Sequence, residues 1–388
     1  MKIALYGGSF NPPHLGHAEA ALAVAREIKP DRLLIVPDNT PPHKTMAEDS
    51  PAPQERMELC RLAFASVPGA ELSDMELRRE GKSYTCDTVR SLMEEHPGAE
   101  LFLVIGTDML ESFEEWYQFR FLLESCTLAA LSRTGDDREK IDERAAHLRA
   151  EYGARVLIVP HEPIEASSER IRRLLPLRAG RELLGEAVYA EIIRRRYYGA
   201  KPELSWLREK TLDLLDSHRV AHVMGCENEA VRLAVHWGED PELAAEAGIL
   251  HDITKRCSLE EQLNLCEKYG IINDNSELKS PRLLHAKTGA ALARELFGAE
   301  TAVCEAIRWH TTGKPDMTRF EKIIYLADYI EPTRDFPGID ELRALAYEDL
   351  DRAMALGLKM TIEEIRRAGY PLYVDTLNAY EWYNEKEK

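Results

Sequence analysis

The hydrophobic pattern of this chain changes in kind at about residue 198, and this change limits the possible folds more than any other feature. Before it, short apolar runs suited to buried strands alternate with helical stretches. The runs are Ile3–Tyr6, Leu33–Val36, Leu101–Ile105, Leu128–Leu131 and Val156–Val159, and the helical stretches include Ala18–Ile28, Gln54–Ala65, Thr85–Glu95 and Arg138–Glu151. Such alternation predicts an α/β fold with a doubly wound parallel sheet, helices on both faces, and ligands at the carboxyl ends of the strands.

The second part of the chain shows only helical periodicity. In the segment Arg194–Pro202, Gly199 and Pro202 stop one element before Trp206 starts another. Helical patterns then run from Leu204 to the end, with glycine or proline stops around residues 240, 270, 281, 298, 313 and 332. We therefore expect two domains, residues 1–198 and 203–388, of which the second is all-α. The length of 388 residues agrees, because it exceeds one ordinary core.

Charge and apolar run lengths argue against several classes of partner. A net charge of −18 disfavours binding to a nucleic-acid backbone, which depends on a positive field. Met1 leads directly into an apolar strand pattern, and apolar stretches are broken by charges well before the roughly 18 residues of a membrane span. The seven cysteines include no C-x-x-C pair and are expected to be reduced, mostly core thiols. We expect a cytoplasmic protein; its oligomeric state, including a homo-oligomer, stays open.

The segment Gly7–His17, with the sequence GGSFNPPHLGH, is suited to a nucleotide phosphate. It follows a predicted strand, and its glycines let the backbone turn tightly. His14 and His17 stand three residues apart at the start of a helix, on the side of its unpaired backbone N–H groups. Alone, H-x-G-H is as often a pair of surface or capping histidines. The preceding strand, the stiff prolines and the Ser9 hydroxyl favour the phosphate-binding interpretation.

This segment resembles the nucleotidyltransferase family that transfers an adenylyl group to a mononucleotide, most closely bacterial nicotinate-mononucleotide adenylyltransferase. The resemblance implies a Rossmann-like nucleotidyltransferase fold, ATP with Mg²⁺ and nicotinate mononucleotide as substrates, and nicotinate adenine dinucleotide and pyrophosphate as products. In that family the H-x-G-H histidines stabilise charge on the α-phosphate during direct attack, without a covalent enzyme intermediate. Adenylyl transfer of this kind needs positioning and electrostatic stabilisation more than a protein nucleophile.

Further segments match the same family in order along the first 198 residues. NTPPHK, residues 39–44, would bring His43 and Lys44 to phosphates, although alone it would be a surface turn. Tyr84–Thr85 and Gly106–Asp108 resemble the acceptor pocket. Trp116–Tyr117 resembles the aromatic pair that closes over the nicotinate ring, although a tryptophan is more often core.

The segment ASSERIR, residues 166–172, resembles the family signature I-S-S-T-x-I-R at another helix start. Ser167, Ser168 and Arg172 match, and hydroxyls with a guanidinium at a helix N-terminus suit a triphosphate. The alternative is a capped helix with a surface arginine. Glu169 stands where the family has threonine, and a carboxylate there would repel a nearby triphosphate.

The resemblance assigns roles to these residues by their place in the motifs. The residues implied to bind ATP are Gly8, Ser9, Phe10, His14, His17, Ser167, Ser168 and Arg172. Those implied to bind nicotinate mononucleotide are Lys44, Thr85, Asp108, Trp116, Tyr117 and Arg133. Those implied to act in catalysis are His14, His17, Lys44 and Arg172.

The helical half carries a second set of chemistry-bearing residues, spread over more than 100 positions. They are His222, His251, Asp252, His285, His310 and Asp328. Imidazole and carboxylate ligands suit a first-row metal such as iron, manganese or zinc. Neighbouring helix residues point about 100° apart, so His251 and Asp252 cannot hold a metal alone, and other elements must supply ligands. A lone His-Asp pair is common by chance.

These runs resemble the HD-domain superfamily of metal-dependent phosphohydrolases over about residues 203–388, most closely the bacterial branch that cleaves diadenosine tetraphosphate, a dinucleoside polyphosphate, into two ADP. The resemblance implies that a catalytic Asp252 can bridge metals and that the site takes one or two ions of iron or manganese. One metal would be held by His222, His251, Asp252 and Asp328, and His285 and His310 would complete a second metal or face the phosphates. Lys255 and Arg334 would contact phosphates, although each alone is an ordinary surface charge.

Alternatives remain for both halves. The first domain could serve another acceptor, such as a pantetheine phosphate, although Trp116–Tyr117 and Gly106–Asp108 argue against this. The second domain could be another nucleotide phosphohydrolase, or a nucleotide-sensing module that regulates without hydrolysing. Its full set of six candidate ligands argues against a pure sensor. His218, four residues before His222, and His236 are expected to lie outside the ligand set.

Overall fold

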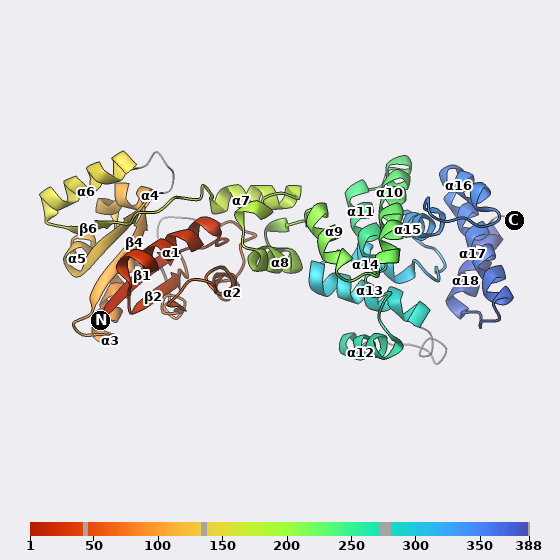
Figure 1. Ribbon diagram of the computed structural model, residues 1–388, viewed down its shortest axis with the longest axis horizontal. Helices are drawn as coiled ribbons and strands as arrows, with labels where there is room; N and C mark the ends of the chain where they lie inside the picture. The colour runs from red at the N-terminus through yellow and green to blue at the C-terminus, as the bar shows by residue number, and fades with distance from the viewer. Residues whose placement is uncertain (42–45, 133–137, 272–280, 387–388) are drawn as a thin grey trace. The chain divides into compact units, whose positions relative to one another are not determined.

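The computed structural model of the chain describes all residues except 42–45, 133–137, 272–280 and 387–388 (Figure 1). The chain divides into two compact units, Met1–Lys201 and Pro202–Lys388. Within the described residues, the first unit holds every strand and the second is helical. The predicted fold class, an α/β doubly wound sheet followed by an all-α domain, is confirmed.

The sheet of the first unit is parallel throughout. Its strands are β1 (Lys2–Gly8), β2 (Arg32–Pro37), β3 (Ala70–Leu72), β4 (Glu100–Gly106), β5 (Cys126–Leu131) and β6 (Arg155–Ile158), in the order β3-β2-β1-β4-β5-β6. The chain leaves β1 toward one edge and returns at β4 to build the other, so the strand order reverses between these two strands, where open parallel sheets bind ligands. The apolar runs predicted all strands except β3, a three-residue edge strand with a charged centre.

Helices cover both faces of this sheet (Figure 1). On one face, α1 (Leu15–Ile28) and α2 (Pro53–Ala63) pack against Ala4, Leu33 and Ile35. On the other, α3 (Thr85–Glu95), α5 (Phe119–Ser125) and α6 (Arg138–Tyr152) pack against the alternate residues, such as Ile3 and Leu34. The strand side chains alternate between two cores, as a doubly wound sheet requires. The short helices α4 (Thr107–Glu111), α7 (Ser168–Leu174) and α8 (Glu186–Arg195) complete the unit.

The second unit is a set of helices separated by the stops expected from the sequence. They are α9 (Leu204–Leu212), α10 (Val220–Trp237), α11 (Pro241–Leu250), α12 (Leu259–Tyr269), α13 (Pro281–Phe297), α14 (Thr301–Trp309), α15 (Arg319–Ile330), α16 (Ile339–Glu348), α17 (Leu350–Arg367) and α18 (Val374–Lys386). Gly238 and Gly270 cap α10 and α12 in the left-handed region, which favours glycine. Asp240 caps α11 by accepting from the N–H groups of Glu242 and Leu243.

Two other expectations concern cysteines and membranes. All seven cysteines are free thiols, and six of them are buried, as the sequence predicts. In the described part of the chain, no helix has both the length and the apolar character needed to cross a bilayer.

Helices α10 and α11, which carry candidate ligands, approach each other backbone to backbone at Gly248. A Cβ at this position would lie 2.7 Å from the Cα of Glu227 and 3.0 Å from its backbone nitrogen. Backbone atoms cannot move aside as a flexible side chain can, so only glycine permits this crossing.

We predict that Gly248→Ala destabilises the second unit by about 1–3 kcal/mol, because the added methyl group forces the two helices apart. Gly357→Ala is the matched control, since this helical glycine has no atom nearer than 3.6 Å to an added Cβ. There, helix propensity should leave stability unchanged or raise it by about 0.5–1 kcal/mol. Urea unfolding followed by circular dichroism at a helical wavelength measures both. Equal effects of the two substitutions would contradict the packing argument.

Candidate active sites

The loop between β1 and α1 is shaped by unusual backbone conformations. Gly7 and Gly8 pair with the end of β2, and the buried Phe10 follows at a φ of 44°, in the left-handed region. The Asn11–Pro12 peptide bond is cis. The chain then enters α1 with His14 at the N-cap. The loop therefore lies at the carboxyl end of β1, where the strand order reverses.

His14 and His17 lie against each other at the start of α1. Their rings stack with centroids 3.7 Å apart, and the His14 backbone N–H donates to Nδ1 of His17 at 3.2 Å. A neutral imidazole that accepts through Nδ1 carries its proton on Nε2. His17 is thus set up as a hydrogen-bond donor through Nε2, next to a helix N-terminus that favours anions. The edge of the Phe10 ring packs on His17 at 5.0 Å.

Gly16 lets a distant segment close over the first turn of α1. A Cβ at this position would lie 2.9 Å from the backbone oxygen of Ile164 and 3.1 Å from the ring of His14. Ile164 belongs to the segment that leads into α7. The glycine between the two histidines is therefore needed for the approach of a second helix start to the first.

That second helix start reaches back to the loop. The Ser168 hydroxyl donates to the backbone oxygen of Pro12 at 2.8 Å, and Arg172 Nη1 donates to that of Asn11 at 2.6 Å. Ser167 caps α7 by accepting from the N–H of Arg170. The structure thus brings Ser168 and Arg172 to the loop before His14, with Ser167 next to them at the N-cap of α7. Glu169, whose side chain is 73% exposed beside Arg173, keeps its carboxylate in solvent.

A buried polar network, which the sequence pattern did not indicate, supports the same loop. Arg56, 1% exposed, donates to the backbone oxygens of Ser9 and Asp38 at 2.5 and 2.7 Å. The Ser9 hydroxyl, expected to face a phosphate, donates to Asp38 Oδ2 at 2.7 Å. Tyr198 donates to Asn11 Oδ1 at 2.7 Å. Each of these residues stands in an ordinary helix or strand-end pattern, so no local signal marks it.

The residues expected to bind the acceptor nucleotide lie in different surroundings from one another. Thr85 begins α3, and Asp108 is exposed on α4, directly after β4. Trp116 packs on the core with its ring 5.1 Å from Phe113. Tyr117 is 54% exposed and lies 4.8 Å from the ring of Tyr84. Trp116 therefore also serves the core, the alternative raised by its residue type. The predicted phosphate contacts His43, Lys44 and Arg133 lie outside the described residues.

Glu114 ties the segment before these aromatic residues to α6. Its carboxylate accepts from the Tyr152 hydroxyl at 2.6 Å and from Arg144 at 2.7 Å, and His147 Nε2 lies 3.3 Å away. The hydrogen bond from Tyr152, followed by those from Arg144 and His147, lowers the pKa of Glu114 to about 2. The ionised form of this carboxylate is therefore the one that holds the segment.

We predict that the stabilising effect of Glu114 depends on pH. Its pKa in the folded chain lies below the ordinary 4.5, so its contribution is full above pH 4.5 and is lost as the pH falls toward 2. The urea midpoint of the wild type should exceed that of Glu114→Gln by a constant amount above about pH 5, and the gap should shrink below pH 4.5. Glu143→Gln, an exposed position on α6, is the control and should show little gap. A difference in urea midpoint between wild type and Glu114→Gln that stays constant down to pH 2 would contradict the stabilising role of the ionised carboxylate.

In the second unit, all six predicted ligand residues come together from five helices or helix ends. His222 lies on α10, His251 and Asp252 directly after α11, His285 on α13, His310 directly after α14, and Asp328 on α15. All six are buried except Asp328, whose side chain is 18% exposed. His218 is exposed in the turn before α10, and His236 Nε2 contacts the backbone oxygen of Tyr347, so neither belongs to this cluster.

The six side chains form two groups joined by Asp252. In the first group, His222 Nε2 lies 3.1 Å from Asp328 Oδ1 and 3.2 Å from His251 Nε2. In the second, His285 Nε2 lies 3.1 Å from His310 Nε2. Asp252 Oδ2 lies 3.5 Å from His251 Nε2, whereas Oδ1 lies 3.2 Å from His285 Nε2. The two oxygens of one carboxylate thus face different groups.

Hydrogen bonds at the far side of the rings fix which nitrogen faces the cluster. Nδ1 of His251 and of His310 donate to the backbone oxygens of Gly248 and Ile307, at 2.8 and 2.6 Å. Nδ1 of His222 donates to Glu331 Oε1 at 3.0 Å. These oxygens can only accept, so each neutral ring turns the lone pair of Nε2 toward the cluster. The close approach of Nε2 of His222 to that of His251 then suits a shared cation.

Burial favours the neutral, ligating form of the imidazoles of His251, His285 and His310. Burial lowers the pKa of His251 and of His285 well below the ordinary value, and that of His310 to about 4. The sets His222, His251, Asp328 and His251, Asp252, His310 each place one ligand atom per residue within 4.8 Å of the others. Neutral imidazoles and carboxylates at this spacing fit a divalent first-row metal ion.

Three cationic side chains surround the cluster. Lys255 Nζ lies 3.0 Å from His285 Nε2, and burial lowers its pKa to about 8. Arg334 Nη2 donates to Asp328 Oδ1 at 2.9 Å. Arg219, which the sequence interpretation missed, contacts the Asp252 carboxylate from the turn before α10. Its place three residues before His222 is the only local signal. This strongly acidic chain therefore concentrates positive charge around one set of ligands.

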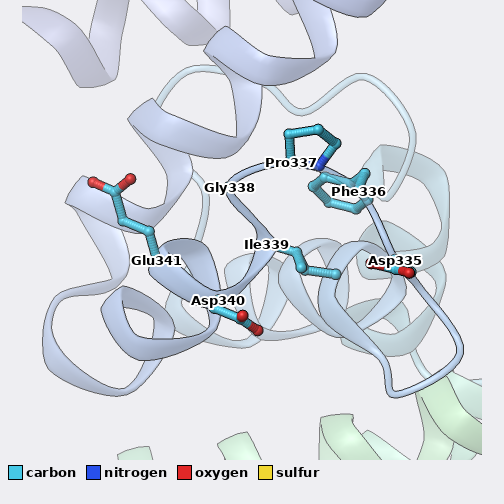
Figure 2. A pocket seen from close by; sticks show the side chains of 7 residues that line it. All are labelled: Asp335, Phe336, Pro337, Gly338, Ile339, Asp340 and Glu341. Carbon is cyan, nitrogen blue, oxygen red and sulfur yellow. The ribbon is translucent and has the colours of Figure 1, made fainter.

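A separate hollow is lined by seven consecutive residues, 335–341, directly after Arg334 (Figure 2). Figure 2 shows Asp335, Asp340 and Glu341 around the apolar Phe336 and Ile339. None of the clustered histidines or aspartates lines it. The hollow belongs to the loop that joins α15 to α16 and to the first turn of α16, and it carries no part of the ligand set.

Comparison with known proteins places each unit in a family. The cytidylyltransferase-like family matches residues 5–174, and the HD-domain family matches residues 219–333. "Bis(5'-nucleosyl)-tetraphosphatase, symmetrical" of Bacillus subtilis is 38% identical over 169 residues, covering 43% of this chain and 90% of that protein. "Probable nicotinate-nucleotide adenylyltransferase" of Geobacter sulfurreducens is 36% identical over 216 residues, covering 51% and 98%. The chain belongs to both families.

A relative with both parts in one chain exists in Mycoplasma genitalium. Named "Probable nicotinate-nucleotide adenylyltransferase/Ap4A hydrolase", it is 26% identical over 371 residues, covering 92% of this chain and 97% of that protein. The two resemblances seen in the motifs are thus confirmed as a fusion of an adenylyltransferase-family unit and an HD-family unit. An HD domain implies a divalent metal, and the histidine and aspartate groups described above are the candidate ligands.

Proposed function

We propose that the first unit transfers the adenylyl group of ATP to nicotinate mononucleotide, giving nicotinate adenine dinucleotide and pyrophosphate. The observation that carries this proposal is the meeting of two helix starts at one loop: His14 and His17 on α1, and Ser167, Ser168 and Arg172 on α7. Helix N-termini with imidazole, hydroxyl and guanidinium donors suit a triphosphate. Mg²⁺ bound with the ATP would neutralise phosphate charge.

In the proposed reaction an oxygen of the mononucleotide phosphate forms a bond to the α-phosphorus, and the bond to the bridging oxygen of the leaving pyrophosphate breaks. Negative charge grows on the non-bridging oxygens of the α-phosphate. The Nε2–H of His17, fixed by the contact of Nδ1 with the backbone, can donate to them. Arg172, held at the loop by the Asn11 oxygen, supplies a fixed positive charge. Lys44 and Arg133 are proposed as further phosphate contacts.

We predict that His17→Ala lowers the rate of adenylyl transfer by about 10²–10³, the usual effect of losing one preorganised donor to a developing charge. Pyrophosphate release from ATP with nicotinate mononucleotide, nicotinamide mononucleotide or pantetheine phosphate measures rate and acceptor choice together. Hydrolysis of diadenosine tetraphosphate by the same variant should be unchanged. Full transfer activity in His17→Ala would refute its role, and preference for pantetheine phosphate would refute the acceptor.

For the second unit we propose metal-dependent hydrolysis of dinucleoside polyphosphates, with diadenosine tetraphosphate giving two ADP. One or two ions of iron or manganese would be held by His222, His251, Asp252 and Asp328, with His285 and His310 on the side of a second ion. The observation that carries this proposal is Asp252, whose two oxygens face the two imidazole groups.

A bound metal of this kind lowers the pKa of its water so that hydroxide is available near neutral pH. The protein's own residues do the rest. Buried neutral imidazoles keep their lone pairs available, and Lys255, Arg334 and Arg219 offer charge to the phosphates from around the ligands. All three sit beside Asp252 or Asp328, so phosphates drawn to them lie close to the proposed ligands.

We predict that removing metal with a chelator abolishes diadenosine tetraphosphate hydrolysis, and that Fe²⁺ or Mn²⁺ restores it in the wild type but not in His251→Ala. Adenylyl transfer, assayed afterwards with Mg²⁺, should survive both the chelator and the substitution. A module that only senses nucleotides would bind diadenosine tetraphosphate without cleaving it at any metal concentration, and that result would overturn the proposal. Chromatographic detection of ADP distinguishes symmetrical cleavage from release of AMP.

A further inference from the structure

Glu331 is a fully buried carboxylate that belongs to none of the motifs described so far. It follows the last residue of α15 and is 0% exposed. Its Oε1 lies 3.0 Å from Nδ1 of His222, on the ring side opposite the ligand cluster. The backbone N–H of Thr333 donates to Oε2 at 2.7 Å, and the Thr333 hydroxyl donates to Oε1. The carboxylate is thus held from both ends.

Helix α10 has a glycine at the point where it passes this carboxylate. Gly225 lies on α10 three residues after His222, and a Cβ there would come within 2.4 Å of Glu331 Oε2 and 3.2 Å of its Cδ. Any other residue at position 225 would push the carboxylate off His222. A glycine inside a helix lowers stability by about 0.5–1 kcal/mol relative to alanine. We therefore regard the space that Gly225 leaves for the carboxylate as part of the site.

Burying a carboxylate is costly unless it is paired, and this one is paired with the imidazole of His222 and with Thr333, while Arg334 Nε lies 3.7 Å from Oε1. A carboxylate that accepts from Nδ1–H of a histidine fixes the tautomer, holds the ring plane and makes Nε2 a stronger ligand. We propose that Glu331 is a positioning residue that orients His222 and strengthens it as a ligand of the metal in the second unit. This inference rests on the metal site proposed above.

The test is the affinity of the metal-free full-length protein for Mn²⁺, measured by titration calorimetry. Glu331→Gln keeps the shape of the side chain and removes its charge, and it should weaken Mn²⁺ binding about 10- to 100-fold, the usual loss for such a partner. Glu229→Gln is the matched control: Glu229 is also buried on this unit but accepts from the hydroxyl of Tyr347 at 2.7 Å, away from the ligands. It should bind Mn²⁺ as the wild type does.

A merely structural role is separated by two further readouts. The melting temperature without metal should fall no more in Glu331→Gln than in Glu229→Gln, while the rise in melting temperature on adding Mn²⁺ should be smaller only in Glu331→Gln. Hydrolysis by Glu331→Gln should recover toward the wild-type rate at high Mn²⁺. If Glu331→Gln does not fold, Gly225→Ala and Thr333→Val, which disturb the carboxylate from either side, take its place with the same expectation.

Two failures can be told apart. The proposed metal site would be refuted if the wild-type protein bound no Mn²⁺, or if the His251→Ala variant bound Mn²⁺ as tightly as the wild type. Wild-type protein whose Mn²⁺ binding depends on His251 but is unchanged in folded Glu331→Gln, or in folded Gly225→Ala, would refute only the positioning role of Glu331.

Discussion

The hydrogen bond made by one ring nitrogen of a histidine decides whether its other ring nitrogen donates a proton or offers a lone pair. In the first unit a backbone N–H occupies Nδ1 of His17, so Nε2 of the neutral ring carries the proton and can donate. In the second unit acceptor oxygens occupy Nδ1 of His222, His251 and His310, so Nε2 offers a lone pair. The same side chain is therefore a donor suited to anions in one unit and a ligand suited to cations in the other.

Much of this arrangement could be predicted from the sequence, because strand, helix and stop signals are local. The apolar runs of the strands, the glycine and proline stops between helices and the motif residues at helix starts all follow short-range rules. The edge strand β3 could not be predicted, since three residues with a charged centre carry no period. Trp116 shows a different limit: its motif position indicated a ligand pocket, whereas its ring also packs on the core.

The supporting residues of both sites were beyond prediction for a physical reason. Arg56, Asp38, Arg219 and Glu331 act through partners far away in the chain, and nothing in their immediate neighbours distinguishes them from surface charges. The motif residues stand at strand ends and helix starts, where short sequence patterns can be recognised. The contacts of the supporting residues depend on how helices and strands pack, so these residues can be identified only in the folded structure.

The contact of Gly16 with Ile164, together with the hydrogen bond from Tyr198 to Asn11, has a consequence for the order in which the protein is made. The loop that begins at the first strand is completed by residues 164–172 and then by Tyr198, almost 190 positions later. A ribosome has therefore synthesised nearly the whole first unit before its first site can close. The growing chain presents the open loop throughout, and the site is finished just as the first helix of the second unit begins to emerge.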